Sequence, residues 1–329
     1  LAGAVFGFGS VKNAFFPASN TPIFFVDYRT PEGTDILETQ RRVAELEEVV
    51  MEMEGVHHLT TVVGGGAQRF TLTYAPEDRF ASYSQLIVET HDKATQQARM
   101  ADVEAVLERD HSDIDYKIAP LEVGPAPKAK IEARLYGSDP AVLRQLGDQV
   151  EALFSDTSNM VSVRTNWRNR VQAVVPIFAE DTARRLGVTR ENLAATLALS
   201  TSGSQVGLYR DGSDLIPIVA RAIPEQRNDI DNLGSLNVWS AEQGRYITAD
   251  QVMRDVTTQV ADPLIMRRDR ERMLAVYGEP DPLSGVTAAS VLAQVRPQVE
   301  ALELPPGYRL EWGGEFETAG EAQSGLFSS

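Results

Sequence analysis

The sequence has no cysteine among its 329 residues. That absence excludes disulfides, thiol catalysis, thiolate zinc sites and iron–sulfur clusters. Histidine is scarce as well, with four residues, which leaves little for an imidazole metal site. Two of the four, His57 and His58, are adjacent at the start of a predicted strand. Because neighbouring residues of a strand point to opposite faces, we expect no metal site there.

An excess of positive charge and long apolar runs are also missing. Lys and Arg number 31 against 47 Asp and Glu, which gives a net charge of −16 at pH 7. So acidic a surface repels phosphate backbones and argues against a nucleic-acid-binding protein. No run of about 20 apolar residues occurs, so we expect no membrane-spanning helix in this stretch of chain. The hydrophobic content of 43% is nevertheless ordinary for a chain that folds around a core.

The first third of the chain has the residue pattern of a β-α-β-β-α-β unit. Apolar residues between Asp35 and Gly55 recur at spacings of three and four, which places them on one face of a helix. A second helix is expected over 84–107. Strands are expected at 23–28, 56–63, 70–74 and 114–118. This order predicts a split βαβ, or ferredoxin-like, unit.

The pattern begins again after the Pro- and Gly-rich segment 124–128, which is typical of a linker. A strand, a helix and a strand are expected by residue 164, and the missing strand, helix and strand follow only at 273–312. The intervening segment, 168–264, has two short helices and two hairpin patterns. The sequence therefore predicts an α+β fold with two ferredoxin-like subdomains, the second interrupted by an inserted α+β subdomain.

No catalytic group of residues is evident, and we expect neither an enzyme nor a cofactor. Gly64, Gly65 and Gly66 lack the spacing of a phosphate-binding loop, and no Lys-Ser or Lys-Thr pair follows them. Three glycines in a row favour a flexible connection between two strands. If that connection moves, Gln68, Arg69 and Phe70 are carried at its edge.

Two charged residues leave alternatives open. Asp27 interrupts an apolar strand, and it either faces water at an edge or places one carboxylate in an apolar cleft that favours cationic ligands. Arg164 lies near Trp167, and the two form either an ordinary surface pair or a cation that contacts a ligand beside an aromatic ring.

Short segments in a fixed order, along nearly the whole chain, carry a family resemblance. They are Phe15–Pro17, Pro31–Thr34, Gly64–Phe70, Ala183–Thr189, Met266–Arg268, Arg272, Leu274–Val276, Leu304–Tyr308 and Trp312–Glu315. In this order the sequence resembles the resistance–nodulation–division (RND) efflux transporters, in their drug-exporting hydrophobe/amphiphile branch. The resemblance is to the second periplasmic loop, between the seventh and eighth transmembrane helices.

The resemblance implies a division of the chain. Two porter subdomains would comprise 21–124 and, for the split one, 125–167 with 265–315. The insert at 168–264 would be a docking subdomain that faces an outer-membrane channel. Residues 1–20 and 316–329 would flank membrane helices.

The function that the resemblance implies is proton-driven export of hydrophobic and amphiphilic compounds across a bacterial inner membrane. Intact relatives are homotrimers that work with a periplasmic adaptor and an outer-membrane channel. Their proton-carrying residues lie in membrane helices, so substrate capture and docking would be the share of this periplasmic stretch.

The resemblance also implies site residues. The segment from Gly64 to Arg69 matches a switch loop, with Phe70 beyond it, although it is shorter than in the best-known drug pumps. Pocket residues fall on Phe25, Asp27 and Leu72. Residues at the substrate entrance fall on Ile131, Ala133, Leu135, Arg164, Asn166, Ala275 and Tyr277.

Three other interpretations stay open. Heavy-metal exporters of the superfamily use methionine clusters that suit Cu(I) and Ag(I), but the seven methionines here fall mostly on predicted helices or strand ends. An independent soluble enzyme could be built on ferredoxin-like domains, because the fold alone specifies no chemistry. The chain could also be an assembly module without a ligand site.

Overall fold

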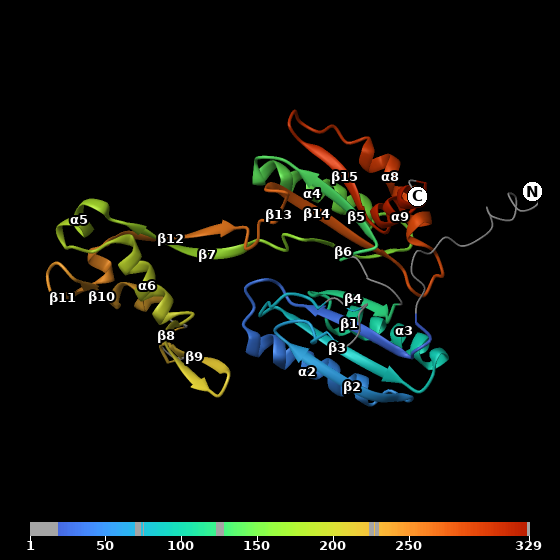
Figure 1. The fold of residues 1–329 in the computed structure, drawn as a ribbon, viewed down its shortest axis with the longest axis horizontal. Helices are drawn as coiled ribbons and strands as arrows, with labels where there is room; N and C mark the ends of the chain where they lie inside the picture. The colour runs from blue at the N-terminus through green and yellow to red at the C-terminus, as the bar shows by residue number, and fades with distance from the viewer. Residues whose placement is uncertain are drawn as a thin grey trace, which may run out of the picture. The chain divides into compact units, whose positions relative to one another are not determined.

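The computed structural model describes residues 19–69, 74, 76–122, 128–223, 227 and 230–327 of the chain. The chain divides into two compact units. The larger unit runs as far as Val171 and resumes at Asp262, and the smaller unit is Gln172–Ala261, within the insert predicted at 168–264. The ribbon in Figure 1 shows sheets and helices in both units, which confirms the predicted mixed fold class.

The first part of the larger unit is a four-stranded antiparallel sheet with two helices. The strands follow one another across the sheet in the order β2-β3-β1-β4, as in a ferredoxin-like unit. The elements in chain order are β1 (Ile23–Arg29), α2 (Ile36–Met51), β2 (Val56–Val63), β3 (Tyr83–Thr90), α3 (Lys93–Asp110) and β4 (Asp115–Pro120).

The third strand of this sheet corrects the sequence prediction. Residues 84–90 were expected to begin a helix, but they form β3, and α3 starts only after Asp92. The Asp92 side chain accepts a hydrogen bond from the Thr95 amide over 2.8 Å, which caps the helix there. The apolar run from Leu86 to Val88 is too short for its period to distinguish a strand from a helix. Of the strand predicted at 70–74, residues 70–73 lie outside the described residues.

The two faces of β1 have different environments. Phe24, Val26 and Tyr28 are fully buried in the core beneath α2 and α3. Because strand residues alternate between faces, Phe25 and Asp27 point to the other side of the sheet. The face without helices is therefore the one that offers polar side chains.

The second part of the larger unit repeats this topology. Its strands lie in the order β6-β14-β5-β15, which corresponds strand by strand to the order of the first sheet, and a short β13 also pairs with β14. The elements are β5 (Ile131–Tyr136), α4 (Pro140–Ser155), β6 (Met160–Thr165), β13 (Arg267–Arg268), β14 (Glu271–Pro280), α8 (Ala288–Glu300), β15 (Arg309–Gly314) and α9 (Glu315–Phe327).

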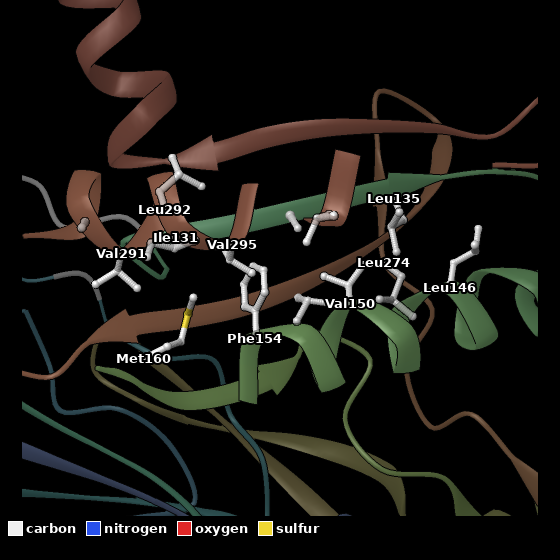
Figure 2. Packing of buried hydrophobic residues seen from close by; sticks show 14 of the residues in the cluster. Ile131, Leu135, Leu146, Val150, Phe154, Met160, Leu274, Val291, Leu292 and Val295 are labelled. Atoms are coloured by element: carbon white, nitrogen blue, oxygen red, sulfur yellow. The ribbon is translucent and has the colours of Figure 1, made fainter. Parts of the chain in front are cut away.

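The core of this second part lies between its sheet and the helices α4 and α8 (Figure 2). Ile131 and Leu135 of β5 point into it with Phe154 of α4 and Val295 of α8. Helix α4 comes very close to β14 at Gly147, where an added Cβ would lie 2.7 Å from the Leu274 side chain. The regular spacing of apolar residues on α4 predicts this packing.

The smaller unit has short elements around its own core. Ala183, Leu193, Val238, Ile247 and Val252 are buried there. The elements are β7 (Val171–Phe178), α5 (Glu180–Arg185), α6 (Arg190–Ser200), β8 (Ser204–Asp211), β9 (Asp214–Ala220), η1 (Ile230–Ser235), β10 (Asn237–Ser240), β11 (Arg245–Thr248), η2 (Ala249–Gln251) and β12 (Met253–Ala261). Strand β7 pairs with β12, and the two predicted hairpins are β8–β9 and β10–β11.

The β8–β9 hairpin is apolar on its exposed surface. Its exposed hydrophobic side chains are Val206, Leu208, Tyr209, Leu215, Ile216, Ile218 and Val219. Contiguous exposed apolar surface of this kind marks interaction sites in soluble domains. In the part of the chain that the structure describes, no helix combines the length and the apolar character needed to cross a bilayer.

Candidate functional site

The candidate site begins on the helix-free face of the first sheet. Asp27 of β1 is paired in register with Gln85 of β3 on one side and with Lys117 of β4 on the other. Phe25 lies two residues before Asp27, and Tyr83 lies two residues before Gln85. These side chains share one face because each strand alternates its residues with a period of two.

A cavity of about 350 Å³ lies over this face. Its apolar walls include Phe25, Tyr83 and Tyr74, and the rings of Phe25 and Tyr74 stack with centroids 5.4 Å apart. The opposite wall comes from the end of β14 and the residues after it, Glu279–Pro282 and Val286. The cavity thus lies between the two repeated parts of the larger unit.

Three side chains are directed at the carboxylate of Asp27. Tyr83 donates a hydrogen bond to it over 2.6 Å, Gln85 donates one over 2.9 Å, and Arg29 lies 3.2 Å away. Burial would raise the pKa of Asp27, but Arg29, Lys117 and the two hydrogen bonds outweigh it and lower the pKa below its ordinary value. Asp27 is therefore ionised and already neutralised, so it does not offer the open carboxylate for a cation that one sequence hypothesis required.

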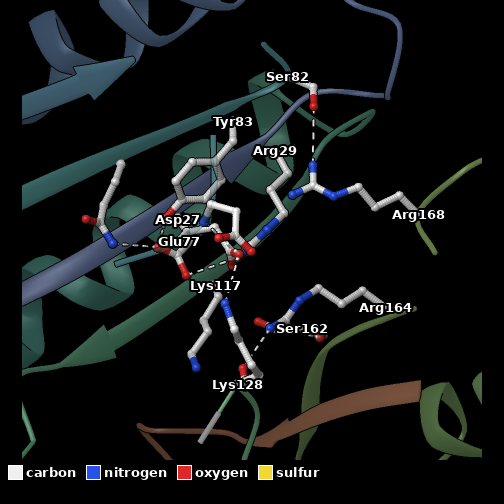
Figure 3. Close-up of polar contacts among 12 residues, drawn as sticks. Asp27, Arg29, Glu77, Ser82, Tyr83, Lys117, Lys128, Ser162, Arg164 and Arg168 are labelled. Atoms are coloured by element: carbon white, nitrogen blue, oxygen red, sulfur yellow. Dashed lines mark hydrogen bonds and ion pairs between the residues drawn. The ribbon is translucent and has the colours of Figure 1, made fainter. Parts of the chain in front are cut away.

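Ion pairs connect the walls of the cavity (Figure 3). Arg29 lies 3.5 Å from Glu77, and Lys128 lies 3.2 Å from the same carboxylate. Lys117 of β4 lies 2.6 Å from Glu279 of β14, which joins the first sheet to the second. Since these carboxylates and cations are paired, the walls combine aromatic surface with locally neutral polar groups.

The glycine loop is fixed to the chain that follows it. The Gly64 amide donates to the Tyr83 carbonyl over 2.7 Å, and the Gly66 amide donates to the Glu77 carbonyl over 3.2 Å. Gly64 has a φ of +84°, and a Cβ on Gly66 would lie 2.4 Å from the Glu77 nitrogen. Glycine is thus required for close approach at Gly66, and the loop positions the Glu77 main chain.

The remaining residues of the predicted switch loop differ in burial. Gly65 is buried, Gln68 and Arg69 are exposed, and the Arg69 Nε donates to the Tyr74 carbonyl over 3.1 Å. Phe70 and Leu72, which the sequence also assigns to the site, lie outside the described residues.

A second cavity of about 90 Å³ adjoins the first. Arg164, Asn166 and Tyr277, three of the predicted entrance residues, line it. Arg29, Glu77 and Lys128 line both cavities. The predicted pocket residues Phe25 and Asp27 therefore line the larger cavity, and three predicted entrance residues line the smaller one beside it.

Arg164 has a different aromatic partner from the one proposed. Its guanidinium lies 5.2 Å from the Tyr277 ring centroid, whereas Trp167 is contacted by Arg144 at 5.5 Å. Trp167 is fully buried and donates to the Met273 carbonyl, so it has no free face for Arg164. The register of β6 with β14, which pairs Arg164 with Tyr277, explains the difference.

Four predicted entrance residues lie on the wall of neither cavity. Ile131, Ala133 and Leu135 are at most 1% exposed and pack into the core against α4 and α8. Residues i, i+2 and i+4 of a strand share one face, and here that is the helix-covered face. Ala275 is fully buried, and its amide donates to the Asn166 side chain over 2.8 Å. This places these four side chains away from the cavities.

Sequence reasoning missed several residues that line the larger cavity. They are Tyr74, Tyr83, Gln85, Lys117 and Glu279. If residues 83–90 had been recognised as a strand, its period of two would have placed Tyr83 and Gln85 on one face.

The adjacent histidines do not follow the simple alternation of a strand. The register of β2 against β3 shifts between Val56 and His58, and the rings of His57 and His58 lie 4.3 Å apart. The bulge explains why the expectation of opposite faces was wrong. Among the described residues, no group of three or more His, Cys, Asp or Glu is arranged to hold a metal ion.

A family model and several known proteins match the chain. The family model described as the AcrB/AcrD/AcrF family matches residues 1–328. The chain is 25% identical over 195 residues to the nickel and cobalt resistance protein CnrA of Cupriavidus metallidurans. It has the same identity over the same length to the nickel-cobalt-cadmium resistance protein NccA of Alcaligenes xylosoxydans xylosoxydans. Each match covers 58% of this chain but only 18% of the curated relative.

Solved structures share the fold. The chain is similar to crystal forms I and II of a heavy metal efflux pump, with a TM-score of 0.77 and 20% sequence identity in both cases. The likeness covers 98% and 97% of this chain, and 34% and 33% of those chains. At this identity the likeness extends to the fold and not to the ligand.

Proposed function

The chain belongs to the AcrB/AcrD/AcrF family, and we propose that it is the periplasmic substrate-capture and docking portion of a proton-driven RND efflux pump in a bacterial inner membrane. Its role is transport rather than catalysis. The observation that carries the proposal is the cavity between two sheets of equal strand order. A space between two repeated units can change its volume when the units move, which suits capture and release.

The proposed substrates are hydrophobic or amphiphilic compounds. The larger cavity, at about 350 Å³, falls within the roughly 300–1,000 Å³ typical of small-molecule sites. Phe25 and Tyr74 supply aromatic surface to the cavity wall, whereas Tyr83 is fully buried and directs its hydroxyl at Asp27. Such walls with few unpaired polar groups accept many related molecules, because little in them demands one hydrogen-bonding pattern.

Heavy-metal export is the second candidate. It is favoured by the names of the relatives CnrA and NccA and of the heavy metal efflux pump structures. A metal site needs ligands that are free to coordinate, and the carboxylates of Asp27, Glu77 and Glu279 are paired with Arg or Lys side chains. The pairing supports the amphiphile proposal over this one.

We assign assembly to the smaller unit. The proposed division keeps porter subdomains at 21–124 and at 125–167 with 265–315, and a docking subdomain at 168–264. The exposed apolar hairpin β8–β9 supports a partner-binding role. The partners in this proposal are two further copies in a homotrimer, an outer-membrane channel and a periplasmic adaptor.

Fluorescence titration of the chain with the neutral dye N-phenyl-1-naphthylamine tests the proposal. We expect saturable binding that Phe25→Ala weakens by about tenfold or more, since the variant removes a half-buried aromatic side chain from the cavity wall. Tyr209→Ala on the exposed hairpin controls for dye bound outside the cavity and should leave the affinity unchanged. A parallel calorimetric titration with Ni²⁺ and Co²⁺ should give no stoichiometric binding. Tight metal binding with no dye binding would instead favour the second candidate.

A further inference from the structure

Glu315, the first residue of α9, lies close to the start of β5. Its amide donates to the Lys130 carbonyl over 2.9 Å. Gly314 before it has a φ of +70°, and a Cβ there would lie 2.4 Å from the same carbonyl oxygen. The close approach that glycine permits therefore holds Glu315 against the chain that enters β5.

Lys130 is a cation that two carboxylates share. Its Nζ lies 2.5 Å from the Glu122 carboxylate and 4.0 Å from that of Glu315. Glu122 follows β4 in the first repeated part of the larger unit, whereas Lys130 and Glu315 belong to the second. The side chains of Glu122 and Glu315 are only 12% and 15% exposed, so water screens their mutual repulsion weakly. One ammonium thus serves two carboxylates from different parts.

Glu279 of β14 adds a third carboxylate at the same place. Its Oε2 accepts a hydrogen bond from the Lys130 amide over 3.3 Å, and its Oε1 lies 2.6 Å from Lys117 of β4. Arg164 of β6 also acts on Glu279 electrostatically. Glu279 therefore has cations of its own, and it places negative charge next to the shared lysine.

The other charged groups around the start of α9 are paired with one another. Arg134 lies 2.7 Å from Glu132 and 2.7 Å from Glu317, and Arg268 lies 3.0 Å from Glu317. Arg296 of α8 forms its ion pair within its own helix. These cations are engaged elsewhere, so they do not relieve the crowding of carboxylates at the shared lysine.

The proton affinity of Glu315 reflects this crowding. Burial raises the pKa of its carboxyl above the ordinary 4.5, and Glu122 and Glu279 add to the rise while Lys130 opposes it. Lys130 stays charged: burial lowers its pKa, but the three carboxylates outweigh burial and raise the pKa above its ordinary value. Of these two groups, Glu315 is the one that changes charge in mildly acidic solution.

The junction between the two repeated parts is polar at this point. The two parts have separate hydrophobic cores, and among the described residues no buried side chain belongs to both. Ion pairs join the parts here, Lys130 with Glu122 and Lys117 with Glu279. Parts of a chain that share no large apolar interface are expected to move relative to one another. The strength of this junction therefore depends on the charges that face it.

We infer that Glu315 is a proton-binding site that controls how firmly the two repeated parts are joined beside the larger cavity. When Glu315 is neutral, Lys130 pairs with Glu122 alone, and the link between the parts is strong. When Glu315 is ionised, it competes for Lys130 and repels Glu122 and Glu279, so the link is weaker. The inference goes beyond the proposed capture of substrates and does not depend on it.

The direction of the pH effect follows from the proton affinity of Glu315. The joined arrangement holds the proton more tightly than a solvated glutamate does, because the pKa of Glu315 is raised in it. Its extra stability is therefore fully present below the ordinary value of 4.5 and is lost as the pH rises through the raised pKa. Acid strengthens the junction, and alkali weakens it.

Carboxyl-carbon NMR measures the protonation of Glu315 directly. We expect a glutamate resonance that titrates with a midpoint above 4.5 and that is absent from Glu315→Gln. Lys130→Gln removes the cation that favours the ionised form and should raise the midpoint further. A midpoint at or below 4.5 in the native chain would overturn the proton site.

Spin-label distances between the two parts measure the junction. The chain has no cysteine, so labels attached at Glu48→Cys on α2 and Gln298→Cys on α8, both exposed positions, are selective. We expect the mean distance to change by more than about 2 Å between about pH 5 and about pH 8, with a broader distribution at the higher pH. In Glu315→Gln the distribution should stay narrow at both pH values.

Two comparisons complete the test. Glu303→Gln removes an exposed carboxylate of the second part and should leave the pH dependence of the distance as in the native chain. If Glu315→Gln does not fold, the native chain still decides, because a distance that is equal at both pH values overturns control of the junction. A pH-dependent distance that persists in Glu315→Gln overturns the role of Glu315. Neither measurement uses a dye, so a failure of substrate capture would leave this test unaffected.

Discussion

Gln85 donates a hydrogen bond to Asp27 over 2.9 Å while its amide oxygen accepts from the Tyr74 hydroxyl over 2.5 Å and from the Ala67 amide over 3.2 Å. One side chain of β3 thus joins the buried carboxylate to the segment after the glycine loop. The arrangement fixes the polar floor of the larger cavity relative to its aromatic wall.

Replacing Gln85 with Leu should destabilise the fold by about 1–3 kcal/mol, because it leaves buried partners without a hydrogen bond. Equilibrium urea unfolding measures the change. Hydrogen exchange at the Ala67 amide should also become faster, since that amide loses its acceptor. Gln298→Leu, on the exposed face of α8, is the control and should change stability by less than about 0.5 kcal/mol. Unchanged exchange at Ala67 in the Gln85 variant would contradict the account.

Stability should depend on pH through Asp27. Its pKa in the folded chain lies below the ordinary value of 3.8, so its contribution is present above that pH and is lost as the pH falls through the folded pKa. Asp27→Asn should therefore be most destabilising near neutral pH, and its difference from the native chain should shrink in acid below about 3.8. Urea unfolding at several pH values gives this difference. If the stability difference between Asp27→Asn and the native chain instead increases in acid, the pKa of Asp27 is not lowered in the folded chain.

Phe154→Ala should cost about 3–5 kcal/mol of stability, because the side chain is fully buried between α4, α8 and the second sheet. Phe316→Ala is the matched control: that ring is 45% exposed, and we expect a loss of less than about 1 kcal/mol. Thermal and urea unfolding of both variants provide the comparison. Equal losses would mean that the core is not where the structure places it.

Gly66→Ala should perturb the site through the backbone. The added Cβ would lie 2.4 Å from the Glu77 nitrogen, so the chain around Glu77 must move. We expect weaker binding of N-phenyl-1-naphthylamine together with reduced stability. Gly320→Ala in α9, where no neighbour lies within 4 Å of the new Cβ, should leave dye binding unchanged. If Gly66→Ala binds the dye like the native chain, the loop does not position the cavity.

Much of the fold could be predicted from the sequence because its helices are amphipathic. Helices α2, α4 and α8 carry apolar residues at spacings of three and four, and those residues are buried. The caps at Asp35, Thr189 and Thr287 are local features that single sequences display. The paired β-α-β order then predicted the repeat.

The sequence predictions that were wrong concern features that depend on long-range strand pairing. The strand β3 has a continuous apolar run that a short window does not distinguish from a helix. The partner of Arg164 depends on the register of β6 with β14, two strands more than a hundred residues apart. The positions of His57 and His58 depend on a β-bulge that no local sequence pattern indicated.

The candidate site likewise has residues that the sequence placed correctly and residues that it did not. Phe25 and Asp27 could be placed on one strand face, and they line the larger cavity. Ile131, Ala133 and Leu135 also share a strand face, but sequence alone did not reveal that helices cover it. Which of two faces is buried is decided by packing with distant elements.

The most direct test of substrate capture is a crystal structure of the chain soaked with a brominated naphthylamine. The account predicts anomalous density for bromine in the larger cavity, between Phe25 of β1 and Pro280 at the end of β14. Density confined to the exposed β8–β9 hairpin, with the cavity empty at saturating ligand, would contradict it.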